Sequence, residues 1–557
     1  MNAARDIDRH AAEVGIDHLK PDQRRAVEAL LAGCDVLGVL ASGFGKSVVF
    51  RVAATMLDGV TVVISPLIAL QHDQVLAVAD TDAVTAVAIH SGLSASRTEE
   101  AWRRVADADT GVLLYLTPEQ AARSEVRERL TFVSVAAVVV DEAHCIAAWG
   151  HDFRPAYLRI AEFVDAVGRP PILALTATAP PPVRDEIVTR LGLTEPLLVV
   201  GDVDRPGIHL SVRLHAHAED VVSAVVHDVV DLARGVGTGL VYTATQAATT
   251  QYADLFAQHG LRALAYHGGL SAGVRSEVHR RFVSGDVDVV VATSAFGMGI
   301  DNPNVRFVVH AAPPDSLERY YQEFGRAGRD GESARAILHY RAEDLGLQNF
   351  FAVRRPNEKV VRTVLRAVVA ATDPLSTEAI IALPSVSARS AGTALDLLER
   401  VDAVRLHRGA DGTAGWIDLD SDVRAVMARV RSAARAEESA ATSRVEMMRR
   451  YAEAGRCRRR MLLEYFGGTS DDTANDERCG RCDSCESGRA DRTAVAAGDS
   501  SAADLGLAPG DRVRHEQWGD GDVVSVEADR VTAHFDEQGY RTLASSVARD
   551  RGLLRPA

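Results

Sequence analysis

The sequence predicts an α/β protein with two parallel-sheet domains of the same type, followed by smaller modules. Short Val-, Leu- and Ile-rich runs alternate with helical stretches in two successive series. The runs lack polar alternation, as strands covered on both faces do. Each run is followed at once by a polar or small-residue motif. At 557 residues the chain is also too long for one core, because a domain takes roughly 150 residues.

The first series predicts a domain over residues 1–203. The motifs after its runs are, in chain order, ASGFGKS, SPL, TPE, DEAH and TAT. Motifs at the carboxyl ends of parallel strands meet at one edge of the sheet, where ligands bind. The predicted strands are Val36–Leu40, Val60–Ile64, Val112–Leu116, Val135–Val140 and Ile172–Leu175.

The second series repeats this pattern over residues 204–345, which we interpret as a second α/β domain. Residues 346–371 are expected to form connecting helices. The predicted strands are Leu240–Tyr242, Ala263–Tyr266, Val287–Val291, Val305–Val309 and Ala336–Leu338.

The C-terminal third of the chain predicts three smaller modules. Residues 372–420 contain two helix-like stretches, Ser376–Leu383 and Ala388–Leu398, and two short strands, Val404–Leu406 and Trp416–Asp418. This combination favours a winged helix. Residues 421–486 are helical and Arg-rich, and residues 487–507 have the composition of a linker. Residues 508–557 return to strand signals and predict a small β-barrel of about five strands.

Composition places the chain among ordinary globular proteins. It is 47% hydrophobic and 25% charged, which is typical of that class. No run approaches the roughly 18 apolar residues of a membrane helix, and the N-terminal residues are polar, so we expect a cytoplasmic protein without a membrane partner. The net charge of −15 argues weakly against nucleic acid, but such binding depends on local patches.

The segment Ala41–Ser47 predicts a phosphate-binding loop. Gly43 and Gly45 let backbone N–H groups face phosphates, Lys46 is expected to pair with the β- and γ-phosphates of ATP, and Ser47 to hold Mg²⁺. Only three of the 62 basic residues are lysines, and a compact ammonium suits this position better than a guanidinium. The strict GxxxxGK[ST] pattern fails because its first position is Leu40. The alternative is a chance turn.

Two further motifs predict ATP hydrolysis. After the run Val135–Val140, Asp141 is expected to bind Mg²⁺ through water, and Glu142 to orient and deprotonate the attacking water. Far downstream, Arg326 and Arg329 would bring positive charge to the transition state from the second domain. This requires both domains to meet at one nucleotide. The alternatives are an acidic pair that caps a helix and a solvated basic turn.

Four of the six cysteines fall late in the chain and predict a metal site. Four thiolates suit a closed, tetrahedral and structural Zn²⁺ site. Disulfides are the alternative, less common in a cytosolic chain. The predicted zinc ligands are Cys457, Cys479, Cys482 and Cys485.

Together these residues resemble a superfamily 2 helicase, most closely the RecQ family. Further motifs carry the resemblance: Ser65–Leu70, Thr117–Glu119, Thr176–Thr178, Phe296–Ile300, and the stretch 322–331. It implies two RecA-like motor domains, adenine recognition by Gln23 and Lys20, and 3′→5′ unwinding of DNA. The expected nucleotide-binding residues are Lys20, Gln23, Ser42, Gly43, Phe44, Gly45, Lys46, Ser47, His144 and Gln322.

The family carries an aromatic-rich loop directly after its DEAH motif, and residues 141–157 match it. Trp149 and Phe153 offer faces on which single-stranded bases can stack, while His151 and Arg154 offer charge near the backbone. The alternative is that both aromatic residues lie in the core. The resemblance adds Ser65, Pro66, Leu67 and Thr117 to the expected DNA-binding residues.

The chain also departs from the family pattern. Ala147 and Ala148 replace polar residues of the aromatic loop, and the winged-helix segment lies before the zinc cysteines. Residues 509–554 resemble the Tudor-like barrel that ends UvrD-type helicases, which implies a protein partner. A stabilising appendage is the alternative.

We therefore expect an ATP-dependent DNA helicase of replication, recombination or repair. It would act on single-stranded and tailed duplex DNA, use ATP, Mg²⁺ and Zn²⁺, and associate with the nucleoid in the cytoplasm. The alternatives are an RNA or RNA–DNA hybrid helicase, a duplex translocase that does not separate strands, and a non-enzymatic scaffold.

Overall fold

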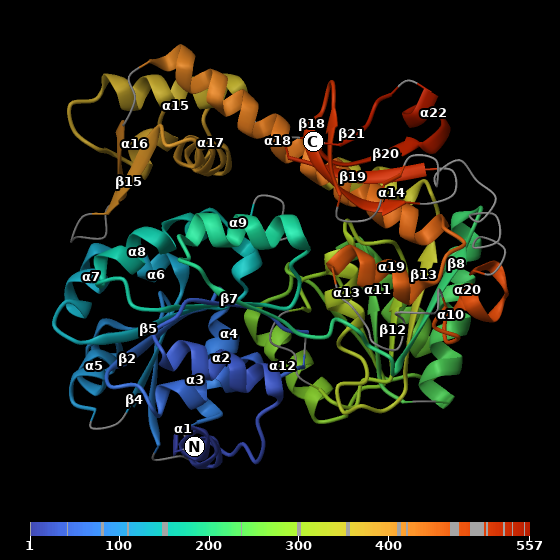
Figure 1. Cartoon of the computed structure of the whole chain (residues 1–557), viewed down its shortest axis with the longest axis horizontal. Coiled ribbons are helices and arrows are strands. Elements are labelled where there is room, and N and C mark those ends of the chain that lie inside the picture. Colours follow the sequence, from blue (N-terminus) through green and yellow to red (C-terminus); the bar gives the residue numbers. More distant parts are fainter. Residues whose placement is uncertain are drawn as a thin grey trace.

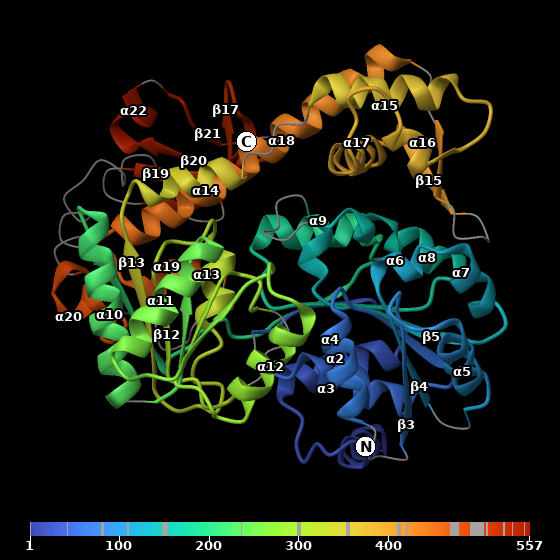
Figure 2. The same cartoon turned by 180° about the vertical axis from the view of Figure 1, so that it is seen from behind.

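Two parallel-sheet domains lie side by side, and the C-terminal third of the chain lies over both of them (Figures 1 and 2). This arrangement comes from a computed structural model. The described residues are 2–41, 43–78, 83–108, 111–147, 154–235, 237–297, 302–352, 357–408, 414–418, 422–467, 478–490, 506–507, 511–526, 530–536, 538–550 and 552–556.

The first domain is built on a seven-stranded parallel sheet with the order β3-β4-β2-β5-β6-β1-β7. Every residue of β1, β2 and β6 is buried, which explains why these strands are continuously apolar. The strands are β1 (Val36–Val39), β2 (Val60–Ile64), β3 (Val84–Ile89), β4 (Gly111–Leu116), β5 (Val135–Val140), β6 (Ile172–Thr176) and β7 (Leu197–Val200).

Helices cover this sheet and create two apolar clusters. Side-chain caps define several helix starts: Ser94 accepts a hydrogen bond from Arg97 N, and Thr117 from Gln120 N. The helices are α1 (Asn2–Glu13), α2 (Pro21–Leu31), α3 (Lys46–Ala54), α4 (Ile68–Leu76), α5 (Ala95–Ala106), α6 (Pro118–Ala121), α7 (Ser124–Leu130), the 3-10 helices η1 (Ala143–Ile146) and η2 (Pro155–Arg159), α8 (Ile160–Ala166) and α9 (Pro181–Leu191).

The second domain has a six-stranded parallel sheet in the order β10-β11-β9-β12-β13-β8. Its strands are β8 (Ile208–Leu214), β9 (Gly239–Tyr242), β10 (Ala263–Tyr266), β11 (Val289–Ala292), β12 (Phe307–His310) and β13 (Ala334–Tyr340). Its helices are α10 (Ala218–Gly235), α11 (Gln246–Gln258), α12 (Ala272–Val283), α13 (Leu317–Phe324) and α14 (Asp344–Ala352). Two parallel sheets of one type confirm the predicted fold class.

The next module contains both predicted helices and the predicted strand pair. Helix α15 precedes the predicted boundary at residue 372 but shares an apolar core with α16, α17 and the start of α18. The elements are α15 (Glu358–Ala370), β14 (Leu375–Ser376), α16 (Thr377–Ile381), α17 (Ala388–Arg400), β15 (Val404–Arg408) and β16 (Ala414–Asp418), and the strands pair antiparallel in the order β14-β16-β15. We call residues 357–418 the winged module, and its winged-helix assignment stays a prediction.

Helix α18 (Val423–Glu453) has 31 residues and joins this module to the second domain. Val426, Met427 and Val430 pack in the core of the winged module. Val445 and Tyr451, near its other end, pack in the core of the second domain. Figures 1 and 2 show the helix crossing from one domain toward the other.

After α18 comes the predicted zinc-bearing module, by which we mean residues 457–490, and the chain continues to an antiparallel sheet. Helix α19 (Arg458–Phe466) contributes buried residues to the second domain's core, and α20 (Asp483–Glu486) lies beside β8. The sheet has five strands in the order β20-β19-β18-β17-β21. They are β17 (Arg512–His515), β18 (Gly519–Val526), β19 (Arg530–Phe535), β20 (Gly539–Ala544) and β21 (Arg555–Pro556), with α22 (Ser545–Asp550) after β20.

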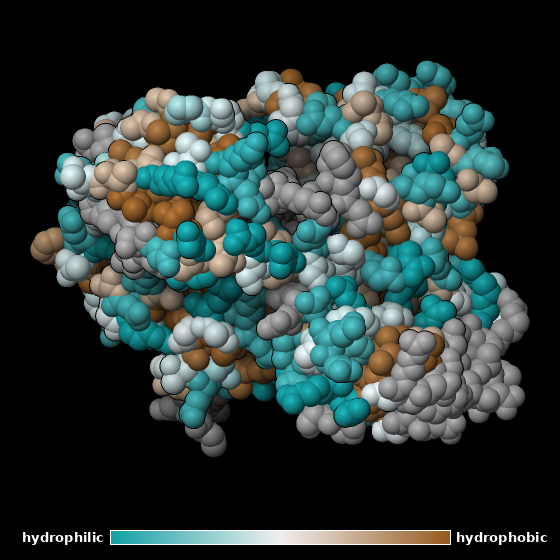
Figure 3. Space-filling view, turned by 90° about the horizontal axis from the view of Figure 1, so that it is seen from above, coloured by the Kyte–Doolittle hydropathy of each residue, from teal (hydrophilic) through white to brown (hydrophobic). Residues whose placement is uncertain are grey.

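Among the described helices, none is long and apolar enough to span a membrane. The face seen from above is predominantly hydrophilic, with apolar residues scattered among polar ones (Figure 3).

Candidate active site

The predicted phosphate loop lies between β1 and α3, with Lys46 as the first residue of α3. Gly43 and Gly45 have φ values of 79° and 87°, in the left-handed region that favours glycine. A Cβ on Gly45 would lie 2.8 Å from Gln23 Nε2. The loop therefore presents backbone groups at a helix N-terminus, which is where phosphates bind. Ser47 is half-buried beside Lys46, and Ser42 lies outside the described residues.

Gln23 and Lys20 hold the backbone of this loop. Gln23 Nε2 donates to Phe44 O at 2.9 Å and to Gly45 O at 3.1 Å. Lys20 Nζ lies 4.2 Å from the centre of the Phe44 ring, within the range of a cation–π contact. These contacts place both residues at the nucleotide end of the sheet, and their recognition of adenine stays a prediction.

The two predicted acidic residues lie at the end of β5, next to the loop. Asp141 accepts hydrogen bonds from Glu142 N at 3.0 Å and from Ser65 Oγ at 3.3 Å. Burial raises the pKa of Asp141 to about 6, the charge of Glu142 raises it too, and the charge of Lys46 opposes both. A half-buried carboxylate near a lysine has the chemistry of a Mg²⁺ ligand. Glu142 has a φ of 48°, a strained conformation of the kind found at functional sites.

Polar contacts link Glu142 to the TAT motif. His144 Nδ1 lies 3.4 Å from Glu142 Oε2 and 2.9 Å from Thr176 Oγ1. Thr178 N in turn donates to Thr176 Oγ1 at 3.2 Å. His144 is fully buried, and the nucleotide-binding role expected for it stays a prediction.

The two arginines after α13 occupy different places. A Cβ on Gly43 would lie 3.3 Å from Cγ of Arg329, so Arg329 of the second domain packs against the phosphate loop of the first. Arg326 is 4% exposed, and its Nη2 lies 3.5 Å from a Cβ placed on Gly297. Burial raises the pKa of Tyr242 to about 12, and Arg326 beside it opposes that rise. Gln322 is half-buried on α13.

The expected DNA-binding residues of the first domain lie at the same sheet edge. Ser65 and Thr117 are buried, and their hydroxyls contact Asp141 and Gln120 N. Arg154 Nη1 donates to Pro66 O at 3.4 Å, and Leu67 is the residue directly before α4. Trp149, His151 and Phe153 lie outside the described residues.

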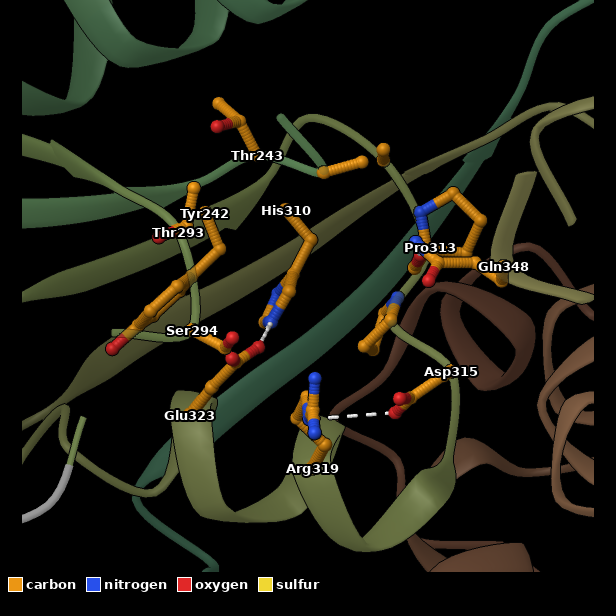
Figure 4. A pocket seen from close by; sticks show the side chains of 13 residues that line it. Tyr242, Thr243, Thr293, Ser294, His310, Pro313, Asp315, Arg319, Glu323 and Gln348 are labelled. Atoms are coloured by element: carbon orange, nitrogen blue, oxygen red, sulfur yellow. Dashed lines mark hydrogen bonds and ion pairs between the residues drawn. The ribbon is translucent and has the colours of Figure 1, made fainter. Parts of the chain in front are cut away.

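Sequence reasoning missed a polar pocket of about 70 Å³ at the carboxyl edge of the second sheet. Thr243 and Thr293 line it directly after β9 and β11, and Arg319 and Asp315, which also line it, form an ion pair of 3.3 Å (Figure 4). His310 Nε2 lies 2.8 Å from Glu323 Oε2. The signal used for the first domain, a polar residue directly after an apolar run, would have found both threonines.

The four late cysteines come together. Their Sγ atoms all lie within 4.8 Å of one another, and Cys479 and Cys485 are 4.0 Å apart. Cys457 precedes α19, and Cys482 forms a β-bridge with Leu210 of β8. Four converging sulfurs fit a tetrahedral Zn²⁺ ion.

The fold and the arrangement of the site are of the superfamily 2 helicase type, and sequence comparisons agree. Residues 20–187 match the DEAD/DEAH box helicase domain, and residues 222–331 match the helicase conserved C-terminal domain. Residues 420–486 match the RecQ zinc-binding domain, and residues 507–549 match a protein family of unknown function, DUF3553.

Curated relatives give the narrower family. The chain is 35% identical over 335 residues to the probable ATP-dependent DNA helicase RecS of Bacillus subtilis, 60% of this chain and 66% of that protein. It is 37% identical over 343 residues to ATP-dependent DNA helicase RecQ of the same organism, 61% of this chain and 56% of that one. The matches thus span half to two thirds of these relatives. The chain belongs to the RecQ-like branch of the superfamily 2 helicases.

Solved structures support the fold alone. The Mycobacterium smegmatis helicase Lhr bound to ssDNA and AMP-PNP has a TM-score of 0.50 at 20% identity, and the match covers 95% of this chain and 78% of that one. The DUF1998 helicase MrfA bound to DNA has a TM-score of 0.51 at 16% identity, with 75% and 63% covered.

Proposed function

We propose that this protein is an ATP-dependent DNA helicase that moves 3′→5′ along one strand and unwinds tailed duplex DNA. One observation carries the proposal: Arg329 of the second motor domain packs against Gly43 in the phosphate loop of the first. ATP bound at this loop would therefore contact both domains, and its hydrolysis would change how they meet.

The described side chains supply the parts that phosphoryl transfer needs. Lys46 and the loop N–H groups would neutralise the phosphates, while Ser47 and Asp141 would hold Mg²⁺, which stabilises charge on the transferred phosphoryl group. Glu142 would accept the proton of the attacking water. Arg329 and Arg326 would stabilise the transition-state charge.

A single strand would lie along the carboxyl edges of both sheets. On the first domain, residues 65–67, Thr117 and Arg154 lie at that edge. Trp149, His151 and Phe153, which precede Arg154 in the sequence, would stack with and contact the strand. On the second domain, the pocket lined by Thr243, Thr293 and Arg319 offers hydroxyls and a guanidinium suited to a phosphate. The winged module and the Arg-rich zinc module would hold the duplex ahead of the strand.

Two roles are expected for the C-terminal sheet: binding a protein partner and stabilising the rest of the protein. Its contacts favour stabilisation. Ser443 Oγ of α18 donates to Tyr540 O at 3.2 Å and accepts from Tyr540 N. Ser439 Oγ donates to Gln538 O at 2.7 Å. These bonds cover the edge strand β20, so a protein partner would have to bind elsewhere on the sheet. Zn²⁺ held by the four cysteines would stabilise the neighbouring module.

The bacterial relatives are consistent with a protein of the cytoplasm, and a DNA-tracking enzyme would associate there with the nucleoid. Replication, recombination and repair are the processes in which such unwinding is needed.

The test is ATP hydrolysis without nucleic acid and with single-stranded DNA, duplex DNA or single-stranded RNA. Stimulation by single-stranded DNA alone, followed by unwinding of a 3′-tailed but not a 5′-tailed duplex, is the expected result. Stimulation mainly by RNA would indicate an RNA helicase. Stimulation by duplex without strand separation would indicate a translocase, and an absence of hydrolysis would indicate a scaffold.

A further inference from the structure

Residues 201–207 link the two motor domains. Arg205 in this linker forms hydrogen bonds with the turn that carries Arg326 and Arg329. Arg205 Nη1 donates to Gly325 O at 3.0 Å, and Arg205 Nη2 donates to Ala327 O at 2.8 Å. These two carbonyls stand on either side of Arg326. One planar guanidinium therefore spans the turn, as its fixed fork of donors allows.

The carbonyls that Arg205 binds lie at the C-terminal end of α13. Helix ends leave carbonyl groups without intrahelical partners, and a cation there also meets the negative end of the helix dipole. Gly325 permits this close packing, because a Cβ on it would lie 2.8 Å from Tyr321 O and 3.7 Å from Arg205 Nη1. Arg205 thus supplies hydrogen-bond donors to two carbonyl groups of this turn.

A further hydrogen bond joins the linker to α13. Tyr321 Oη donates to Val203 O at 2.8 Å, two residues before Arg205. The turn continues through Gly328, whose N–H donates to Val305 O at 3.0 Å. A change in the linker's position is therefore transmitted to the segment that carries Arg329.

The zinc-bearing module also contacts the linker. Arg459 on α19 forms an ion pair with Asp204, which is 9% exposed. Arg459 follows Cys457 by two residues, so metal binding at the cysteines and the place of the linker share one short helix. Arg184 of the first domain donates to Phe466 O at the other end of that helix.

We propose that Arg205 is a positioning residue for ATP hydrolysis: it holds the turn 325–329 so that Arg329 lies against the phosphate loop, and the Arg459–Asp204 ion pair ties this placement to the zinc-bearing module. The proposal rests on the proposed function, because it assigns Arg205 to the same hydrolytic site.

The experiment compares Arg205→Gln with Arg205→Lys and with Arg262→Gln, a control that removes an exposed, ion-paired arginine of the same domain. Removing an arginine finger costs about 10³–10⁵ in kcat, and a displaced one costs less, about 10–100-fold. We expect that loss of kcat in Arg205→Gln, with KM for ATP within about twofold. Arg205→Lys should be intermediate, because one ammonium cannot bridge both carbonyls, and Arg262→Gln should behave as wild type.

A double-mutant cycle with Arg329→Gln separates positioning from a general loss of stability. If Arg205 acts through Arg329, the double variant should lose little more kcat than Arg329→Gln alone. Additive losses would overturn the proposal, as would an unchanged kcat in Arg205→Gln.

Hydrogen exchange at residues 324–329 tests the same contact without activity. The amides of Ala327 and Gly328 are hydrogen-bonded, and we expect them to exchange at least about tenfold faster in Arg205→Gln while β9 is unchanged. If the wild type hydrolyses no ATP, the proposed function fails, and this measurement still decides whether Arg205 holds the turn. Unchanged exchange would overturn the proposal.

Discussion

At the scale of single residues, the groups expected to act on ATP lie where the backbone or the side chain is held in an unfavourable state. Glu142 has a positive φ, in the left-handed region that residues other than glycine rarely adopt. Next to it, the pKa of the Asp141 carboxyl group is raised. Unfavourable backbone conformations and shifted pKa values of this kind persist only where the surrounding structure enforces them. Here the strand β5 and the buried pair His144 and Thr176 do so.

Glu142→Gln should abolish most ATP hydrolysis and leave ATP binding intact. The amide keeps the shape of the side chain but cannot accept a proton from water, and a general base contributes about 10²–10⁴-fold to the rate. The measurement is kcat with single-stranded DNA, alongside the affinity for a non-hydrolysable ATP analogue. Glu128→Gln, at an exposed position of the same domain, is the control. Hydrolysis at the wild-type rate would remove Glu142 from the mechanism.

The sequence predicted these residues from local signals. Asp141 and Glu142 directly follow an apolar strand, and Lys46 belongs to the glycine-containing loop that follows one. Arg205 carries neither of these signals. Its partners are carbonyl groups of residues that lie 120 and 122 positions away in the sequence. No side-chain chemistry marks a backbone acceptor, so the residue could be found only once the fold placed α13 beside the linker.

At the scale of elements, strands in the interior of a sheet were predicted and several others were not. The edge strands β3, β7 and β8 were missed. In β8, Ile208–Leu214, the half-buried His209 and Ser211 and the exposed Arg213 interrupt the apolar residues, since one face is less covered. In β3, Thr85 and two alanines weaken the apolar run. Edge positions relax the burial on which the prediction depends.

Cys482→Ser should remove the metal and loosen the zinc-bearing module. Cys482 is fully buried, and three remaining thiolates cannot close a tetrahedral site. We expect zinc content to fall from about one ion per chain to well below half, together with lower solubility and a lower melting temperature. Cys34→Ser, at an exposed cysteine outside the cluster, should change neither. Wild-type zinc content and melting in Cys482→Ser would contradict the assignment.

The C-terminal sheet should lose stability in mild acid because of His534. Burial lowers the pKa of this histidine to about 4, whereas an unfolded histidine titrates near 6.5. The unfolded state therefore binds more protons between these values, and stability falls as pH drops from about 6.5 to about 4, by roughly 3 kcal/mol in full.

Thermal unfolding at pH 7 and pH 5 measures this effect. His534→Phe should narrow the difference in Tm between the two pH values, because it removes the titrating group from the β19 interior. His227→Gln, at an exposed position on α10, should leave the difference as in the wild type. An equal pH response in His534→Phe would assign the acid sensitivity to other groups.

At the scale of the whole molecule, the winged module is attached to both motor domains. Helix α18 carries it from the second domain's core. On the first domain, Arg159 of η2 forms an ion pair with Glu399 of α17. Since η2 begins directly after the predicted stacking loop, a closing of the two motor domains would move the winged module relative to a bound strand.

Reversing one charge of this pair should therefore uncouple unwinding from hydrolysis. In Arg159→Glu or Glu399→Arg, two like charges would meet in a partly buried contact, and the winged module would detach from the first domain. We expect ATP hydrolysis within about twofold of wild type, because neither residue touches the nucleotide site, and unwinding of a 3′-tailed duplex reduced about fivefold or more per ATP.

The charge-swapped double variant supplies the decisive comparison. Arg159→Glu with Glu399→Arg restores an ion pair of opposite orientation, so unwinding should recover toward the wild-type level. The same three variants at the exposed pair Arg129 and Glu99 in the first domain control for charge alone and should unwind normally. If the single reversals at Arg159 and Glu399 unwind as well as wild type, the contact between α17 and η2 is incidental, and the winged module works from the second domain through α18 alone.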